Sequence, residues 1–191
     1  MGRGGLLFSS ESVTCGHPDK LCDAISDAIV DACIEMDPNA RVAVETLVKS
    51  VDGKGHIVLA GEVTLNHPFI PDYEGIARKT ASNIGYSDHG IGMDATSEEL
   101  CEVQQFITTQ AANIAQGVDR DGAGDQGLMF GYACIETEGF DELKGRFFPL
   151  AAALSQRLTR RLRTVRELPA SAKGCLPWVR PDGKSQVTIE Y

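Results

Sequence analysis

The chain has 191 residues, 42% of them hydrophobic and 24% charged, which is the composition of an ordinary globular protein with a full core. Its formal net charge of −9 argues against a nucleic-acid-binding surface and leaves room for metal ions. No apolar stretch approaches the roughly 20 residues of a membrane-spanning helix, and none resembles a signal peptide, so we expect a cytoplasmic protein without nucleic-acid or membrane partners. Six scattered cysteines include no Cys-x-x-Cys pair, which favours reduced thiols over a zinc site or disulfides.

An amphipathic helix is predicted near the N-terminus. Apolar residues recur at helical spacing between Lys20 and Met36 and predict one buried face. Acidic residues on the same stretch follow a four-residue step: Asp19, Asp23, Asp27, Asp31 and Glu35. We interpret this acidic stripe as a solvated face, except for Asp19, which lies in the polar turn before the helix, close to His17.

Two strands, 41–49 and 56–65, are predicted next, and the Asp52-Gly53 pair between them is typical of a hairpin turn. Each strand carries one carboxylate within an apolar run, Glu45 in the first and Glu62 in the second. One interpretation is a glutamate on the solvated face of a strand. The other is a paired or ligand-bound carboxylate. Because both faces of each strand are largely apolar, the sequence favours the two interpretations about equally.

The middle of the chain gives weaker signals. A helix is predicted over 73–84, ended by Gly85, and the polar stretch 104–117 is interpreted as a mobile loop or a polar helix. The apolar run 128–135 predicts a buried strand.

A long helix over 149–167 and the start of a strand at 187–191 complete the predicted order. The long helix has leucines along one side and five arginines over much of the rest: Arg157, Arg160, Arg161, Arg163 and Arg166. These arginines indicate either a solvated face or a surface for an anion or a partner. Strands and helices alternating in both halves predict an α/β chain.

Three short polar segments carry the functional signal: Gly16–Lys20, Gly122–Gly127 and Arg180–Gln186. Each combines glycine or proline with an acid or base that is costly to bury without a partner. The second has the G-x-G-x-x-G spelling, but it follows polar sequence and leads into an apolar run rather than a helix, which argues against a dinucleotide-binding loop. Together the three segments indicate a site for a polyphosphate and its metal ions.

These segments, in this order, resemble the S-adenosylmethionine synthetase (methionine adenosyltransferase) family. The stretches that carry the resemblance are 8–13, 16–20, 23–28, 40–46, 61–64, 117–119, 122–133 and 176–188. The resemblance implies a two-layer α+β fold of repeated β-α-β-type units with mixed sheets. It also implies that residues 1–117 form the N-terminal domain, with a gating loop near 104–121, and that 122–191 form part of the second of three similar domains.

The resemblance implies a reaction in which the methionine sulfur attacks C5′ of ATP. The whole triphosphate leaves and is then hydrolysed to pyrophosphate and phosphate. By motif position, His17 resembles the donor to the departing oxygen, and Lys184 resembles the contact to the phosphate chain. The implied catalytic residues are His17, Lys184 and Asp125, and the implied ATP contacts are His17, Lys20, Asp182, Gly183 and Lys184.

The remaining implied roles concern methionine and cations. Glu62 resembles the contact to the methionine ammonium group, Gln110 a contact from the gating loop, and Asp125 a carboxylate that balances the product sulfonium. Asp19 resembles a Mg²⁺ ligand, with two Mg²⁺ expected per site, and Glu45 resembles the residue near K⁺. Hard carboxylate oxygens suit Mg²⁺, which bridges phosphates.

The sequence also departs from the family. Cys15 stands where the family usually has an acidic residue, and the family's later basic, acidic and aromatic site residues have no counterpart within the 191 residues. We therefore expect a subunit completed by a complementary chain in a hetero-oligomer, or an oligomer with itself. The alternatives are a non-catalytic nucleotide-binding or regulatory relative, or a fragment of a longer protein.

Overall fold

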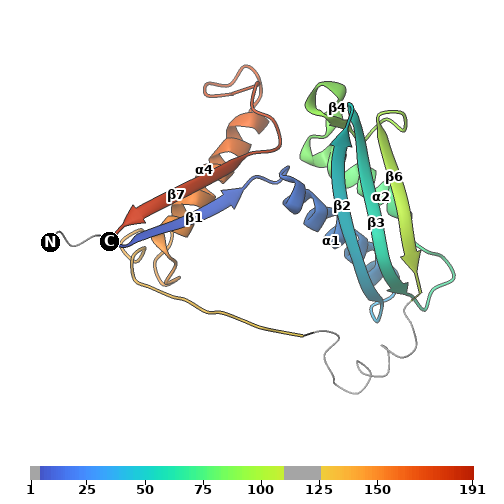
Figure 1. Ribbon diagram of the computed structural model, residues 1–191, viewed down its shortest axis with the longest axis horizontal. Coiled ribbons are helices and arrows are strands. Elements are labelled where there is room, and N and C mark those ends of the chain that lie inside the picture. The colour runs from blue at the N-terminus through green and yellow to red at the C-terminus, as the bar shows by residue number, and fades with distance from the viewer. Residues whose placement is uncertain (1–4, 110–125) are drawn as a thin grey trace. The chain divides into compact units, whose positions relative to one another are not determined.

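The computed structural model describes residues 5–109 and 126–191. The chain divides into two compact units, one combining residues 1–17 with 129–191 and the other comprising residues 18–128. Figure 1 shows the strands and helices of each unit. Helices occur together with both parallel and antiparallel strand pairs, which confirms the predicted α/β class.

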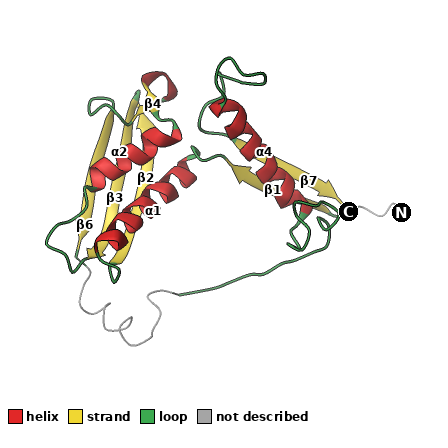
Figure 2. Ribbon diagram, turned by 180° about the vertical axis from the view of Figure 1, so that it is seen from behind, coloured by secondary structure: helices red, strands yellow, loops and turns green. Residues whose placement is uncertain are grey.

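The 18–128 unit is a three-stranded sheet with two helices on one face. Its strands are β2 (Arg41–Val51), β3 (Lys54–Thr64) and β6 (Cys101–Thr108), in the order β2-β3-β6. Strand β3 pairs antiparallel with β2 and parallel with β6. Helices α1 (Pro18–Met36) and α2 (Tyr73–Ile84) lie on the same face of this sheet (Figure 2). The succession β3, α2, β6 is therefore a β-α-β unit.

The predicted hairpin between β2 and β3 is confirmed. Its two turn residues, Asp52 and Gly53, have φ angles of 50° and 81°. Positive φ at both central residues is the backbone of a type I′ turn, whose twist matches that of the flanking strands. The turn fixes the register in which Val51 pairs with Lys54, and with it the register of the whole hairpin.

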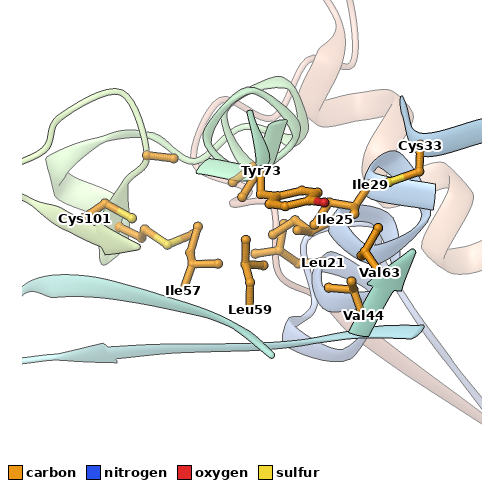
Figure 3. Packing of buried hydrophobic residues seen from close by; sticks show 14 residues of the cluster. Leu21, Ile25, Ile29, Cys33, Val44, Ile57, Leu59, Val63, Tyr73 and Cys101 are labelled. Atoms are coloured by element: carbon orange, nitrogen blue, oxygen red, sulfur yellow. The ribbon is translucent and has the colours of Figure 1, made fainter. Parts of the chain in front are cut away.

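The core of this unit lies between the helices and the sheet (Figure 3). Helix α1 buries one residue per turn, as predicted, and begins at Pro18, whose missing N–H costs nothing at a helix start. The buried side chains are Leu21, Ile25, Ile29, Cys33, Val44, Ile57, Leu59, Val63, Tyr73, Ala77, Ala81, Met93, Ala95 and Cys101. The acidic stripe beyond Asp19 is exposed on the opposite side of α1, which confirms its interpretation as a solvated face.

All six cysteines are free thiols, as the sequence predicts. Cys33 and Cys101 are buried, and the other four are partly buried. Burial raises the pKa of both the Cys33 and the Cys101 thiol, so these two groups stay neutral and behave as small apolar side chains.

Helix α2 begins and ends where the sequence predicts. The side chain of Asp72 accepts a hydrogen bond from the backbone N–H of Gly75, 3.0 Å away, and so caps the first turn. Gly85, with φ at 122°, ends the helix and donates its N–H to the carbonyls of Ala81 and Ser82.

The connection from α2 to β6, residues 85–100, contains β4 (Ser87–Asp88), the 3₁₀ turn η1 (His89–Ile91) and β5 (Met93–Asp94). Strands β4 and β5 pair antiparallel.

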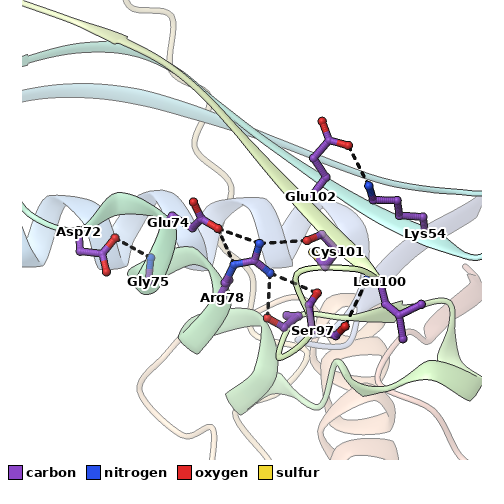
Figure 4. A network of polar contacts seen from close by, with 10 residues as sticks. Lys54, Asp72, Glu74, Gly75, Arg78, Ser97, Leu100, Cys101 and Glu102 are labelled. Carbon is purple, nitrogen blue, oxygen red and sulfur yellow. Dashed lines mark hydrogen bonds and ion pairs between the residues drawn. The ribbon is translucent and has the colours of Figure 1, made fainter.

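Arg78 on α2 ties this connection to the helix (Figure 4). Its guanidinium donates to the backbone carbonyls of Ala95, Ser97 and Cys101, at 3.3, 3.5 and 3.0 Å, and pairs with Glu74 at 2.8 Å. A single side chain therefore joins α2 to the segment that leads into β6.

Replacing this arginine is expected to destabilise the unit. Arg78→Met removes three donors to backbone carbonyls, and hydrogen bonds to charged groups are worth about 1.5–3 kcal/mol, so we expect a loss of about 2 kcal/mol in urea denaturation. Lys79→Met is the matched control, because Lys79 is the exposed neighbour on the same helix, and its effect should stay within about 0.5 kcal/mol. Equal unfolding midpoints for the two variants would contradict a structural role for Arg78.

The other unit is built on β1 (Leu7–Val13) and β7 (Lys184–Glu190), which pair antiparallel. Helix α4 (Leu150–Glu167) packs on one face of this pair. Hydroxyl groups join the layers: Ser12 bonds Thr159 at 2.9 Å, and Ser185 donates to the carbonyl of Ser155 at 2.7 Å. Small side chains on α4 allow this close approach.

Two leucines of α4, Leu154 and Leu158, lie outside its buried face. The residues that α4 buries are Ala151, Ser155, Thr159 and Val165. Leu154 and Leu158 are exposed, as are four of the five arginines; Arg166 is mostly buried. The hydroxyl contacts that join α4 to β1 and β7 lie on the buried face.

Two predictions on the middle of the chain are corrected. Residues 104–108 belong to strand β6, where the sequence indicated a loop or a helix; residues 110–117 lie outside the described residues. The predicted buried strand over 128–135 is irregular and exposed, with Phe130 at 93% exposure. A strand needs a neighbour to complete its hydrogen bonds, and no strand within the described parts of the chain pairs with this segment.

Among the described residues, no helix combines the length and the apolar character needed to cross a bilayer.

Candidate functional site

The first and third polar segments contact each other directly. Strand β1 ends at Val13, which pairs with Lys184 at the start of β7. Beyond the pair, the backbone N–H of Thr14 donates to the carbonyl of Gly183 at 2.8 Å, and the Thr14 hydroxyl donates to the carbonyl of Pro181 at 2.6 Å. The residues that lead into His17 are thus bonded to the residues that lead into Lys184.

Gly16 is required for this contact. It is buried, and a Cβ at this position would lie 2.4 Å from Cβ of Pro181 and 2.6 Å from its carbonyl oxygen. Any side chain would therefore push the two segments apart. The next residue, His17, is partly buried, and its backbone N–H donates to the carbonyl of Thr14 at 3.1 Å, which closes a tight turn.

Lys184 lies on the face of the β1–β7 pair that α4 does not cover. Its ammonium group is 2.7 Å from a carboxylate oxygen of Glu11, and the two side chains are 52% and 50% exposed. A half-exposed pair of this kind adds little stability, so Lys184 can exchange its partner for another anion at small cost. Asp182, just before it, is exposed.

Asp19 and Lys20 lie in the first turn of α1 and are exposed. A carboxylate in a first turn is stabilised by the helix dipole. Within the same unit, a cavity of about 200 Å³ opens beside Pro18 and is lined by residues from α1, the end of β2 and the α2–β6 connection, among them Lys49 and Tyr86.

The thiol next to this turn is held neutral. Burial raises the pKa of Cys22, a hydrogen bond with the Val48 backbone lowers it, and the negative charges of Asp19 and Asp23 raise it again. The net direction is upward, so Cys22 stays protonated at neutral pH.

Glu45 and Glu62 lie on the same face of the β2-β3-β6 sheet, the one opposite α1 and α2. The register pairs Glu45 with Ala60 and Glu62 with Ala43, and the residues that alternate with them point into the core. Glu45 is exposed and Glu62 partly buried. Within the described residues neither forms an ion pair, so each carboxylate is available on an open sheet surface.

Two predicted site residues, Gln110 and Asp125, lie outside the described residues, together with 122–124 of the glycine-rich segment. The roles of Gln110 and Asp125 therefore stay predictions. In the residues that are described, no three His, Cys, Asp or Glu side chains gather closely enough to hold a metal ion by themselves.

The structure adds neighbours that the sequence did not indicate. Glu11 contacts Lys184, and Thr14 joins the two polar segments. Arg166 on α4 lies with its guanidinium 3.9 Å from the sulfur of Cys15. Residues 9–12 are all polar, which marks Glu11 only as a surface residue, and Thr14 is an ordinary residue just after a strand.

The arginine-rich part of α4 borders a separate hollow. A cavity of about 510 Å³ is lined by Arg146, Arg157 and Arg160 with Glu142, and Arg157 pairs with Glu142 at 3.4 Å. Both partners of this ion pair are well exposed. This favours the interpretation of this part of α4 as a solvated face, because Arg157 is paired with Glu142 and Arg160 is exposed to water.

Two family models match the chain. Residues 5–112 match the N-terminal domain of S-adenosylmethionine synthetase, and residues 120–191 match its central domain.

Curated relatives agree with these matches. A protein named S-adenosylmethionine synthase from Roseiflexus castenholzii is 47% identical over 97% of this chain and 45% of its own length. Relatives of the same name from Brachyspira hyodysenteriae and Nocardia farcinica are each 46% identical, over 96% and 98% of the chain. The chain spans about half the length of the curated relatives it matches.

Proposed function

Since this chain belongs to the S-adenosylmethionine synthetase family, we propose that it supplies one half of a site that forms S-adenosylmethionine from ATP and L-methionine. The observation that carries the proposal is the direct bonding of the Thr14–His17 turn to residues 181–183. This contact gathers a histidine and a lysine of two widely separated polar segments within one unit.

In the proposed reaction a lone pair of the methionine sulfur forms the S–C5′ bond while the C5′–O bond of ATP breaks. The triphosphate leaves with the bonding electron pair, and a sulfonium remains. The protein must hold sulfur and carbon in line and stabilise the negative charge that grows on the departing oxygen. The triphosphate is then hydrolysed to pyrophosphate and phosphate.

We assign the ATP side of the site to the first and third polar segments. His17 donates to the departing oxygen, and Lys184 leaves Glu11 to contact the phosphate chain as a point charge. Asp182 and Gly183 complete the nucleotide contact, and Lys20 adds a second cation. The exposure of Lys20, Asp182 and Lys184 supports these roles, because a ligand can reach each of them.

On the methionine side, Glu62 binds the ammonium group. Gln110 and Asp125 complete the contact, Asp125 as the carboxylate that balances the sulfonium. The partly buried position of Glu62, on the sheet face opposite α1 and α2, supports a ligand role. Glu62 pairs in register with Thr108, the last residue of β6. Gln110 follows Thr108 by two positions in the sequence.

The donor set fits Mg²⁺ and K⁺ in part. Mg²⁺ is usually bound through one or two carboxylates together with phosphate oxygens and water, and Asp19 offers one exposed carboxylate for such an arrangement. Glu45 is the corresponding candidate for K⁺. When bound, Mg²⁺ would neutralise phosphate charge. We propose that each site holds two Mg²⁺ ions.

A second polypeptide segment completes the proposed site. The cations named above, Lys20 and Lys184, are few for a triphosphate, and the relatives are about twice as long as this chain. Within the described residues of the 18–128 unit, no helix packs on the sheet face that carries Phe106, whose exposure is 62%. This supports an oligomer, because an exposed apolar surface is normally covered by a partner. We propose a complementary synthetase segment as the partner, and self-association as the second possibility.

The proposal is tested by adding the missing length. The purified chain is mixed or co-expressed with the remaining part of the Roseiflexus castenholzii relative, and product is assayed with ATP, methionine, Mg²⁺ and K⁺. S-adenosylmethionine should form only when ATP, methionine and Mg²⁺ are all present, and faster with K⁺. The chain by itself should form none.

Three results would count against parts of the proposal. ATP binding without product in the complemented protein would indicate a non-catalytic relative. Accumulation of tripolyphosphate would contradict coupled hydrolysis. Turnover at ordinary enzyme rates by the chain alone would show that no complementary segment is needed.

A further inference from the structure

We propose that Thr14 is a positioning residue: its hydroxyl and backbone N–H hold His17 and Lys184 in the relative placement that the reaction needs. The inference rests on the proposed function above and deepens it, because it names a residue that aligns the site without contacting the substrate.

The contacts of Thr14 are unusually concentrated. Its side chain is 6% exposed, and its hydroxyl donates to the carbonyl of Pro181 at 2.6 Å and lies 3.3 Å from the carbonyl of Gly183. Its backbone N–H donates to the Gly183 carbonyl at 2.8 Å. Its methyl carbon lies 3.2 Å from the point where a Cβ of Gly183 would be, so the side chain also sets how closely the chains approach.

Thr14 also controls the turn to His17. The carbonyl of Thr14 accepts the backbone N–H of His17 at 3.1 Å. One residue therefore uses its carbonyl to fix the histidine turn and its hydroxyl and N–H to fix residues 181–183. Lys184 follows that segment at once, and its Cα is set by pairing with Val13.

The consequence for catalysis is geometric. A donor to the departing oxygen and a cation on the phosphate chain act on one ligand, so their separation must match that ligand. A misplacement of about 1 Å from a distant change can lower a rate by about 10²-fold. Residues 181–183 precede β7 and belong to no helix or strand, and the Thr14 hydroxyl and backbone N–H bond the carbonyls of Pro181 and Gly183 within this segment.

The chain provides a matched control for a merely structural role. Thr137 lies in the same unit, is 0% exposed, and donates its hydroxyl to the carbonyl of Phe148 at the same 2.6 Å. Thr137→Val removes a buried threonine–carbonyl bond of equal length away from the two polar segments. Thr14→Ser keeps the hydroxyl and removes only the methyl group, so it serves as the rescue variant.

The first measurement uses the chain alone. Amide hydrogen exchange is compared for Thr14→Val, Thr14→Ser and Thr137→Val, at a temperature where circular dichroism shows all three folded. Thr14→Val should raise exchange of the His17 amide by at least about tenfold, one decade of exchange being about 1.4 kcal/mol. Thr137→Val should leave it unchanged. Equal protection of His17 in all variants would overturn the inference.

The second measurement uses the complemented protein. Thr14→Val should lower kcat at least tenfold with the methionine KM little changed, while Thr14→Ser recovers most of the rate and Thr137→Val stays within about twofold of the unmodified protein. An unmodified complemented protein without product would refute the proposed function itself. An active one in which Thr14→Val keeps full kcat, or loses no more than Thr137→Val, would overturn the inference alone.

Discussion

Gly61→Ala is expected to separate β2 from β3 and to destabilise the 18–128 unit by about 3 kcal/mol or more. Gly61 pairs with Val44 and has φ at 147°, a conformation that residues with a Cβ rarely adopt. A Cβ would lie 1.9 Å from the carbonyl oxygen of Ala43 and 2.9 Å from Cα of Val44. These are backbone atoms, so no side chain can rotate to relieve the overlap.

Gly53→Ala separates the steric effect from the backbone effect. Gly53 also has a positive φ, at 81°, but a Cβ there would have no neighbour within 4 Å. Left-handed backbone costs a residue with a Cβ about 1–2 kcal/mol, and that cost alone is expected at Gly53. Urea denaturation of both variants checks the comparison. Similar losses of stability in the two variants would show that β2 and β3 can move apart at Gly61 without an added steric cost.

Gly61→Ala also bears on the site, since Glu62 follows at once in the chain. A forced shift of β3 against β2 would move this carboxylate on the sheet face. In the complemented protein, we expect the methionine KM to rise for any Gly61→Ala protein that still folds, and the KM for ATP to change less.

Local signals explain which elements could be predicted from the sequence. Helix α1 follows from apolar spacing, the hairpin from Asp52-Gly53, and α2 from its helical pattern and its stop at Gly85. In each case a few adjacent residues favour one backbone conformation, and the tertiary structure agrees with them. Helix α4 and β7 follow in the same way, within three residues of their predicted starts.

Strand β6 could not be predicted because its pairing partner is distant in the chain. Its outward residues Glu102, Gln104 and Phe106 include an apolar one, and the inward positions include Gln105, so the strand shows no clean alternation of apolar and polar residues. What makes it a strand is parallel pairing with β3, from Gly55 opposite Cys101 to Glu62 opposite Thr108. The run 128–135 is the reverse case, because apolar residues predicted a strand for which the described chain offers no partner.

Some residues of the candidate site could be predicted from the sequence, and others could not. Residue types and glycine spacing singled out His17, Asp19, Asp182 and Lys184, and the family matches account for why those motifs occur in order. Thr14 gave no signal, since its significance comes from a hydrogen bond to a carbonyl 167 residues away. The Glu11–Lys184 pair likewise depends on the register of two strands from opposite ends of the chain.

The largest functional effect is expected at His17. In the complemented protein, His17→Asn should slow the displacement step by about 10²-fold or more, because loss of one donor to developing charge costs about 10²–10³ in rate. ATP binding should change much less, since the charge on the departing oxygen develops only as the bond breaks. Asparagine retains the backbone N–H that bonds the Thr14 carbonyl, so the turn itself should persist.

Single-turnover formation of S-adenosylmethionine and direct ATP affinity, measured on the same variant, test this expectation. Lys184→Met is the contrasting variant. Its lost charge contacts phosphate before and during the reaction, so it should weaken the binding of ATP and of tripolyphosphate together. A His17→Asn protein that loses ATP affinity as much as rate would assign His17 a structural role, and a Lys184→Met protein with full tripolyphosphate affinity would remove Lys184 from the site.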